Sequence, residues 1–321
     1  MRHLARRGKC GRQFSKRNSA RENRKIKEPE RIKSNKSSPV PFFCTEPVIG
    51  YGTHAGKKKI NQDALLVMTA EADRFRNPLV IFACVFDGMG GHSDGEKASG
   101  IAAAESERWF RNALPPILAE EDAIRKTADS LKELFEKIHG RLRESGNGSP
   151  EREMGTTACV LLVMDGSYIA AHTGDSRIYV FSETPELITS DHSWVMEEFS
   201  AGRLRKEEMK NDPRRNVLMK CLGIGNGPEP DLRIGKRKEG GLYLLCSDGF
   251  WREKGVLCVR ERYLAGGIRT REEADASVRE GFEENLICGE TDNMTAVLIR
   301  DRGEEMLPAQ NAAEKGGERF V

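Results

Sequence analysis

The hydrophobic pattern of the chain predicts strands that are covered on both faces. Its clearest run is eight consecutive apolar residues, Leu79 to Phe86, too short to span a membrane and of the right length for a buried strand. Further strands are expected over residues 48–54, 64–69, 156–164, 167–172, 177–181, 242–247 and 294–300. Several of these are apolar at nearly every position, whereas an antiparallel strand with one face in water alternates between apolar and polar residues.

Apolar residues at three- and four-residue steps predict helices between the strands. The longest such stripe consists of Ile124, Ala128, Leu131, Phe135, Ile138 and Leu142. A second helix is expected over residues 95–112 with Asp94 as its cap, and a third over residues 274–286. Residues 187–227 are polar and lack a strong period, which predicts a long excursion with helical pieces around residues 193–209.

Tight turns join several of the strands, as at Asp165-Gly166, a two-residue hairpin signal. Strands linked by hairpins favour antiparallel sheets, and the two-sided apolar pattern requires a cover on each face of each sheet. Two stacked antiparallel sheets with helices outside each of them satisfy both conditions. The sequence therefore predicts an α+β protein, a four-layer α-β-β-α sandwich.

Composition narrows the class of protein. The eight cysteines lie at scattered spacings without a CxxC pair, and Cys84, Cys159 and Cys246 sit inside apolar runs. They are interpreted as reduced core residues, not as a disulfide framework or a zinc site. No stretch resembles a signal peptide or a transmembrane helix, so a soluble, cytoplasmic protein is expected.

Charge is distributed unevenly along the chain. Residues 1–39 carry 14 Lys and Arg against 3 Asp and Glu, and the remainder carries 38 against 47. Since residues 1–39 have almost no apolar periodicity, we predict a disordered basic arm, then a folded domain over residues 40–301 and a flexible tail over residues 302–321. The arm has the charge to contact an acidic partner or nucleic acid; the alternatives are a solvated tail or a start codon assigned too far upstream.

Five aspartates each lie beside the end of an apolar run. They are Asp63, Asp87, Asp175, Asp248 and Asp292. One such aspartate can be a simple turn former, but five at strand ends predict a shared cluster of negative charge that needs cations to stay ionised. Gly88, Gly90 and Gly91 allow a sharp turn and leave the Gly88 carbonyl accessible as a further oxygen ligand. An all-oxygen set favours Mg²⁺ or Mn²⁺ over zinc.

The motifs INQD, VFDGMGGH, MGTTA, HTGDSRIYVF, ITSDHS, LLCSDGFW and DNMTAVLI occur in this order over roughly residues 46–300. Together they resemble the metal-dependent serine/threonine protein phosphatases of the PPM type, the protein phosphatase 2C-like enzymes, especially the bacterial ones. The resemblance implies hydrolysis of phosphoserine and phosphothreonine in proteins by a hydroxide that bridges two Mn²⁺ or Mg²⁺ ions. It also implies phosphoprotein substrates and a cognate Ser/Thr kinase that the enzyme opposes.

The same resemblance implies a role for each aspartate. Asp87 would bridge the two ions, with the Gly88 carbonyl on one of them, and Asp248 and Asp292 would complete the other. Asp63 would hold metal-bound waters. Asp175, with Asp248, matches the site of a third ion in bacterial members, and residues 193–215 match a mobile flap.

Two positions depart from the family pattern. Where members usually carry a phosphate-gripping Arg, five residues before Asp63, this chain has Lys58, which keeps the charge but loses the bidentate fork. The alternative is that Lys57, Lys58 and Lys59 only form a solvated loop. Met89 replaces a histidine of the eukaryotic pattern, so His92 is the nearest catalytic candidate for a leaving-group acid, or else a packing or capping residue.

Three functional hypotheses remain at this stage. The first is an active protein phosphatase. The alternative from another class is a weakly active phosphoprotein-binding regulatory module, supported by Lys58 alone. The third, a protein tethered to nucleic acid, rests on the basic arm alone.

Overall fold

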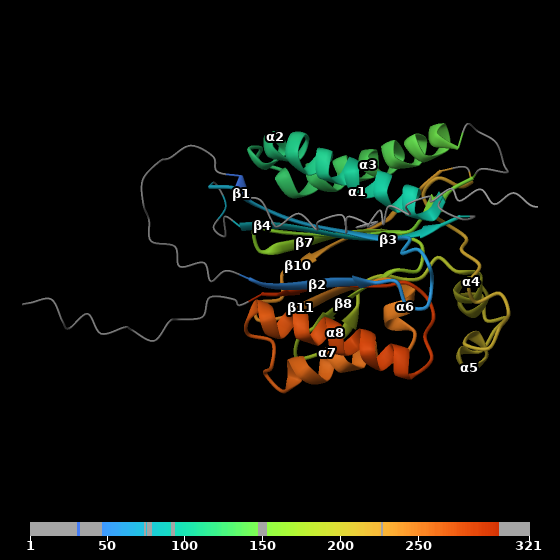
Figure 1. The fold of residues 1–321 in the computed structure, drawn as a ribbon. Helices are drawn as coiled ribbons and strands as arrows, with labels where there is room; N and C mark the ends of the chain where they lie inside the picture. The colour runs from blue at the N-terminus through green and yellow to red at the C-terminus, as the bar shows by residue number, and fades with distance from the viewer. Residues whose placement is uncertain are drawn as a thin grey trace, which may run out of the picture.

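The described part of the chain is a stack of four layers, helices, sheet, sheet and helices (Figure 1). The computed structural model describes residues 31–32, 47–73, 75, 79–90, 94–146, 153–225 and 227–301. The predicted α+β, α-β-β-α architecture is confirmed. No helix in these ranges is long and apolar enough to cross a membrane.

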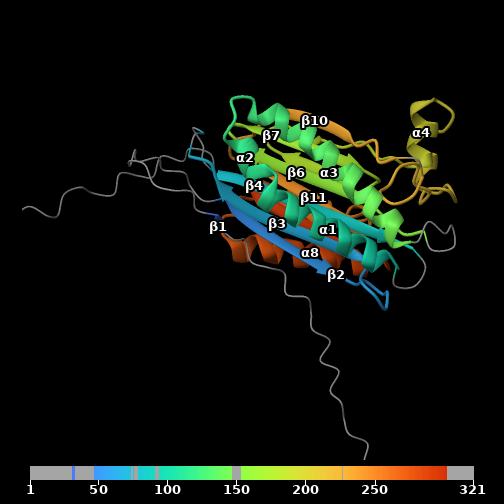
Figure 2. The same cartoon turned by 90° about the horizontal axis from the view of Figure 1, so that it is seen from above.

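The first sheet is covered on its outer face by three helices. Its strands, in spatial order, are β1 (Arg31–Ile32), β3 (Asp63–Glu71), β4 (Leu79–Met89), β6 (Ala158–Met164), β7 (Ser167–Thr173) and β10 (Asp231–Lys236), with β5 (Gly155–Thr156) paired to β4. The covering helices are α1 (Asp94–Asn112), α2 (Leu114–Leu118) and α3 (Ala123–Ser145) (Figure 2). All pairings are antiparallel except that of β1 with β3.

The second sheet is covered by helices from the C-terminal part of the chain. Its strands, in order, are β2 (Val48–His54), β12 (Met294–Arg300), β11 (Leu242–Cys246), β8 (Arg177–Phe181) and β9 (Glu186–Leu187). The helices on this side are α6 (Asp248–Trp251), α7 (Gly255–Leu264) and α8 (Arg271–Ile287). The short helices α4 (Trp194–Ser200) and α5 (Lys206–Met209) lie at one end of the sandwich (Figure 1).

The continuous apolar runs arise because each sheet is buried on both faces. Along β4, Phe82 and Cys84 pack toward the first helix layer, while Ala83 and Val85 pack into the layer between the sheets. All seven residues of β6 are buried in the same two-sided manner. Each fully buried large apolar side chain contributes about 1.5–3 kcal/mol to the stability of the folded state. A slip of one residue would exchange the side chains of the two faces, so this double burial fixes the register of the central strands.

The strands and the three helices expected from the pattern are present. The Asp165-Gly166 hairpin is also confirmed, with both residues at positive φ, 42° and 75°, as a tight hairpin turn requires. The pattern did not predict β9, β10, α2, α6 or α7. Strand β10 was missed because it is an exposed sheet edge without an apolar run.

Two residues of the predicted disordered arm are among those that the structure describes. Arg31 and Ile32 form β1, parallel to Thr69 and Ala70 of β3. The open edge of β3 offers unpaired backbone groups, and two extended residues suffice to pair with them. The rest of residues 1–39 and the whole predicted tail, 302–321, lie outside the described residues, so the domain boundaries stay predictions.

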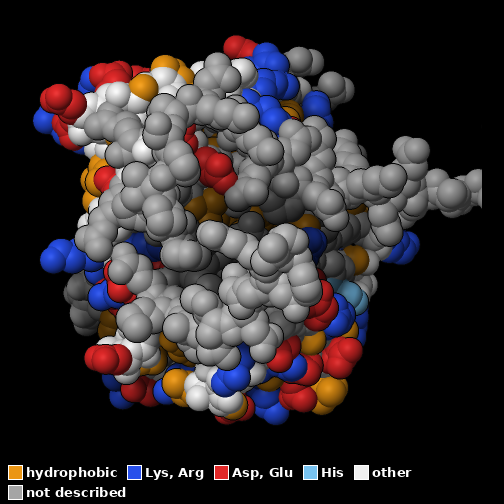
Figure 3. Space-filling model, turned by 90° about the vertical axis from the view of Figure 1, so that its left-hand side faces the viewer, with side chains coloured by type: hydrophobic (Ala, Val, Ile, Leu, Met, Phe, Trp, Pro, Cys, Tyr) orange, Lys and Arg blue, Asp and Glu red, His pale blue; other side chains and the backbone are white. Residues whose placement is uncertain are grey.

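One end of the molecule is seen in Figure 3. On the lower part of its described surface, charged side chains of both signs lie among hydrophobic ones. The chain as a whole is 32% charged, and such mixing is typical of a well-solvated surface.

Gly50 sets how closely α8 approaches β2, which gives a test of the packing. A Cβ at Gly50 would lie 2.5 Å from the Cβ of Ala274, so Gly50→Ala should destabilise the fold by about 1–3 kcal/mol through overpacking. Gly140→Ala, in α3 with no atom within 4 Å of its added Cβ, is the control and should be neutral or stabilising by up to about 1 kcal/mol. Chemical denaturation of both variants checks this; equal effects would contradict the packing interpretation.

Candidate metal centre

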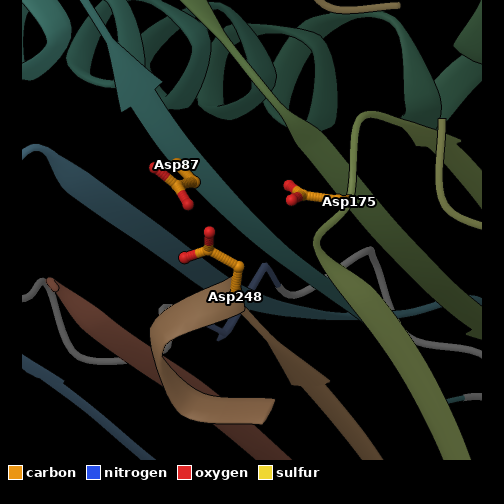
Figure 4. A group of neighbouring side chains, drawn as sticks. All are labelled: Asp87, Asp175 and Asp248. Atoms are coloured by element: carbon orange, nitrogen blue, oxygen red, sulfur yellow. The ribbon is translucent and has the colours of Figure 1, made fainter. Parts of the chain in front are cut away.

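Three aspartates from separate parts of the chain converge at one end of the sandwich. One carboxylate oxygen each from Asp87, Asp175 and Asp248 lies within 4.8 Å of the other two. Figure 4 shows the Asp248 carboxylate pointing toward Asp87, with Asp175 approaching from the side. Asp87 is near the end of β4, Asp175 is in the turn between β7 and β8, and Asp248 begins α6. The three meet because these strands end at the same edge.

The backbone of Asp87 is held by the segment that starts β6. The Thr157 N–H donates to the Asp87 carbonyl at 2.8 Å, and the Asp87 N–H donates to Thr157 Oγ1 at 3.0 Å. The Thr156 hydroxyl donates to the same carbonyl at 3.0 Å. Thr157 Oγ1 also lies 2.8 Å from Ser176 Oγ, next to Asp175. The MGTTA motif therefore fixes Asp87 and the Asp175 turn relative to each other.

Asp63 lies opposite Asp87 on the neighbouring strand, as its partner in the β3–β4 register. Ser247 Oγ, at the end of β11 in the other sheet, donates to Asp63 Oδ2 at 2.8 Å. Asp63 Oδ1 is buried and has no hydrogen-bond partner in the described part of the chain. Burial raises the pKa of Asp63 to about 7, and the charges of Asp248 and Asp292 add to this against the lowering effect of its hydrogen bonds.

The other carboxyls of the cluster have raised pKa values for the same reasons. Burial is the largest cause for Asp87, Asp175 and Asp248, and neighbouring carboxylates add to it. Such a cluster cannot be fully ionised without cations among its oxygens. The converging ligand atoms are all carboxylate oxygens, and one buried oxygen, Asp63 Oδ1, has no hydrogen-bond partner among the described residues. This donor set fits Mg²⁺ or Mn²⁺.

Asp292 lies at the rim of the cluster, outside the close group of three, with 36% of its side chain exposed. Lys58 Nζ is 3.4 Å from Asp292 Oδ1, so the predicted phosphate-binding lysine does reach the site. The loop that carries Lys58 is anchored by Asn293, whose Nδ2 donates to the carbonyls of Ala55 and Ile60 at 2.9 and 3.1 Å. Sequence reasoning had given Asn293 no role, although it lies within the DN motif.

Gly88 occupies a position where only glycine fits. A Cβ there would lie 2.0 Å from the carbonyl oxygen of Gly95 and 2.6 Å from that of Gln62. The Gly88 N–H donates to the Gln62 carbonyl at 3.1 Å, which holds the turn against the start of β3. The use of the Gly88 carbonyl as a ligand stays a prediction. His92 lies outside the described residues, so its role as an acid is also untested.

Two arginines belong to the site and were missed from the sequence. Arg177 makes a double hydrogen bond to Asp191, at 2.8 and 2.7 Å, and its guanidinium lies 3.4 Å above the ring of Trp251. Trp251 Nε1 in turn donates to the Asp175 carbonyl at 2.9 Å, which ties α6 to the Asp175 turn. Arg252, at the end of α6, contacts Asp248. The sequence offered one indication of this contact, because residues four apart on a helix lie side by side and Arg252 follows Asp248 by four.

A histidine pair supports the Asp175 turn from below. His192 Nδ1 accepts the Gly174 N–H at 3.2 Å, and the ring of His192 lies 4.7 Å from that of His172. Burial lowers the pKa of His172 to about 3, and the neighbouring His192 adds to this, so His172 is neutral at physiological pH. His192 Nε2 lies 3.1 Å from Asp231 Oδ2 of β10. These contacts connect the edge strand to the turn that carries Asp175.

Comparison with known proteins gives concordant matches. The family described as "Protein phosphatase 2C" matches residues 52–262. The chain is 30% identical over 256 residues to "Protein phosphatase PhpP" of Streptococcus pneumoniae strain D39, covering 79% of this chain and 97% of that one. The structure resembles that of "Serine/threonine phosphatase Stp1" from Staphylococcus aureus, with 26% identity, a TM-score of 0.66, and 84% and 100% of the two chains covered.

The fold is also shared with the catalytic domain of the phosphatase PstP, which was solved in complex with two manganese ions. Here the identity is 24% and the TM-score 0.59, with 79% of this chain and 99% of that chain covered.

The raised pKa values predict an unusual pH dependence for the metal-free protein. Between the ordinary pKa of 3.8 and the folded-state value of about 7, folded Asp63 holds more protons than unfolded Asp63, so the free energy of unfolding falls as pH rises. Asp87, Asp175 and Asp248 shift in the same direction. The melting temperature in EDTA should therefore drop between pH 5 and pH 8, and saturating Mn²⁺ should remove most of that drop.

Thermal unfolding followed by circular dichroism measures this effect. Asp63→Asn is the matched variant and should flatten the slope in EDTA, because the amide does not ionise. A melting temperature that stays level or rises over this range in EDTA would contradict the interpretation of a buried, repulsive cluster.

Proposed function

This chain belongs to the protein phosphatase 2C family and is a serine/threonine phosphatase, and on that premise we propose how it works. It removes phosphate from phosphoserine and phosphothreonine in proteins, at two Mg²⁺ or Mn²⁺ ions bound by the aspartate cluster. The observation that carries this proposal is the convergence of Asp87, Asp175 and Asp248, all through oxygen atoms.

We propose a role for each ligand residue, following the family resemblance. In this proposal Asp87, which ends near the other two converging carboxylates, would contribute ligand oxygens to both ions, with the Gly88 carbonyl beside it. Asp248 and Asp292 complete the second ion from the other sheet, and Asp63 supports the site from beneath. Asp175 faces Asp87 and Asp248 from the side, so we assign a third ion to Asp175 and Asp248 (Figure 4).

The reaction uses no nucleophile from the protein. Bound divalent ions would supply an activated water and offset charge on the phosphoryl oxygens. Cys246, the one residue that invites comparison with cysteine-dependent phosphatases, is fully buried in β11, and burial raises its pKa far above that of a reactive thiol. The chain's own contribution is to hold the carboxylates in place, which the hydrogen bonds of Thr157, Ser247 and Trp251 achieve.

Lys58 provides positive charge at the rim of the site. Its Nζ is close to Asp292, and half of its side chain is exposed, so it can reach a phosphate arriving from solvent. An ammonium binds phosphate as a point charge, without the paired geometry of a guanidinium. We therefore propose Lys58 as a phosphate-binding residue of moderate strength.

The segment between β9 and β10 provides a surface for the protein part of the substrate. Its helices α4 and α5 lie at the end of the sandwich to which α6 also belongs (Figure 1). Phe199, Val217 and Met219 of this segment are each at least 40% exposed, an unusual fraction for large apolar side chains.

The substrates are phosphoproteins, and the enzyme opposes a Ser/Thr kinase in the cytoplasm.

The deciding assay is phosphate release from a phosphothreonine peptide with Mn²⁺, with Mg²⁺ and with EDTA. Activity with either ion and none in EDTA supports the proposal. Peptide binding without turnover would favour the alternative, a regulatory module that binds phosphoproteins.

Substitution of the ligands tests the metal assignment. Asp87→Asn and Asp248→Asn should each lower kcat by well over a hundredfold, since loss of a supporting residue outside the metal ligands typically already costs about 10–100-fold. Circular dichroism should show that both variants are folded. Asp175→Asn should leave two Mn²⁺ per chain by calorimetry and remove only a third, weaker ion. A folded Asp87→Asn or Asp248→Asn enzyme with near-normal turnover would disprove the assignment.

The role of Lys58 has its own test. Lys58→Ala should raise KM for the phosphopeptide, and kcat falls too if the contact strengthens in the transition state. Lys58→Arg introduces a guanidinium, which can donate two hydrogen bonds to one phosphate. It should raise kcat/KM about tenfold if the added hydrogen bond contributes roughly 1.4 kcal/mol. Lys57→Ala and Lys59→Ala are the controls. If all three alanine variants behave alike at fixed ionic strength, Lys58 is only one member of a basic loop.

A further inference from the structure

Arg252 places a guanidinium between the aspartate cluster and the segment that leads to β10. Its Nη2 donates hydrogen bonds to the Asp248 carboxylate and, at 3.1 Å, to Asn216 Oδ1. Its Nη1 lies 3.8 Å from Asp292 Oδ2. The side chain is 20% exposed, so it lies at the surface of the site and not beneath it.

We propose that Arg252 binds the phosphate group of the substrate. The proposal rests on the function proposed above, because a phosphate bound at ions held by Asp248 and Asp292 has to lie beside the carboxylates that Arg252 already contacts. Within the described part of the chain, the hydrogen bonds of this guanidinium all come from Nη2. The remaining N–H groups, on Nε and Nη1, are the donors available to phosphate oxygens.

The backbone of Arg252 is well fixed for this purpose. Its N–H donates to the Asp248 carbonyl at 3.0 Å, which closes the single turn of α6. The preceding residue, Trp251, is clamped between the Arg177 guanidinium and the Asp175 carbonyl. A planar fork on such a support loses less entropy on binding than the ammonium of Lys58, whose side chain is 52% exposed. Arg252 thus supplies the two-pronged contact that Lys58 does not offer.

The competing explanation is that Arg252 only neutralises the carboxylates. The two explanations differ in what removal of the guanidinium does. A neutralising arginine competes with cations for Asp248, so its loss strengthens metal binding and leaves phosphate affinity unchanged. If Arg252 instead binds phosphate, its removal weakens phosphate binding to the metal-loaded enzyme.

The experiment compares Arg252→Ala and Arg252→Lys with the wild type and with Arg215→Ala, an exposed arginine beside Asn216 that serves as the control for general charge. Calorimetry at saturating Mg²⁺ measures the affinity for inorganic phosphate, and a separate titration measures the affinity for Mg²⁺. We expect Arg252→Ala to weaken phosphate binding about tenfold or more and to raise KM in proportion. Arg252→Lys should weaken it at least about threefold, and Arg215→Ala should stay within about twofold.

Phosphate affinity within twofold of the wild type for Arg252→Ala would overturn the proposal, as would an equal loss for Arg215→Ala. If Arg252→Ala does not fold, Arg252→Lys decides: wild-type phosphate affinity in that variant also overturns the proposal. A wild-type enzyme without metal-dependent turnover would contradict the proposed function instead, and the phosphate titrations would still decide the role of Arg252.

Discussion

The burial of several carboxylates close together is the constraint on which the rest of this structure depends. Burial raises the pKa of Asp63, Asp87, Asp175 and Asp248, and neighbouring carboxylates raise each of them further. Left to themselves, such groups would move apart or into water. They stay together because hydrogen bonds and packing fix the backbone at each of them. The close arrangement therefore lowers the stability of the folded state unless cations bind among the carboxylates.

The hydrogen bonds that fix these backbones cross from one sheet to the other. Ser247, at the end of β11, donates to Asp63 of β3, and Asn293, before β12, accepts the N–H of Gln62 at 2.8 Å. Trp251 connects α6 to the turn between β7 and β8. Neither sheet holds the site alone, since Asp63 and Asp87 lie in strands of the first sheet, whereas Asp248 closely follows β11 and Asp292 closely precedes β12 of the second. This explains why the site is at an end of the stack, where strand ends of both sheets are adjacent.

The sequence predicted the four layers and the aspartates because both leave strong local signals. A short continuous apolar run that is bounded by turn residues is typical of a buried strand, and a following Asp-Gly marks where the strand ends. Which strand ends meet is a long-range property, so the closeness of Asp87, Asp175 and Asp248 and the outlying place of Asp292 needed the structure. Arg252 was missed because α6 is one turn long and shows no periodicity. Strand β10 was missed because it pairs through its backbone while its side chains face solvent.

The apolar layer between the sheets acts as a spacer. Val85 and Leu161 of one sheet pack there against Leu245 and Val297 of the other. The thickness of that layer sets the separation of the carboxylates carried by the two sheets, and close-packed interiors transmit small changes in volume. A methyl group gained or lost in this layer would therefore change the distance between the carboxylates that the two sheets carry. That distance is a property of the hydrocarbon interior, set away from the carboxylates themselves.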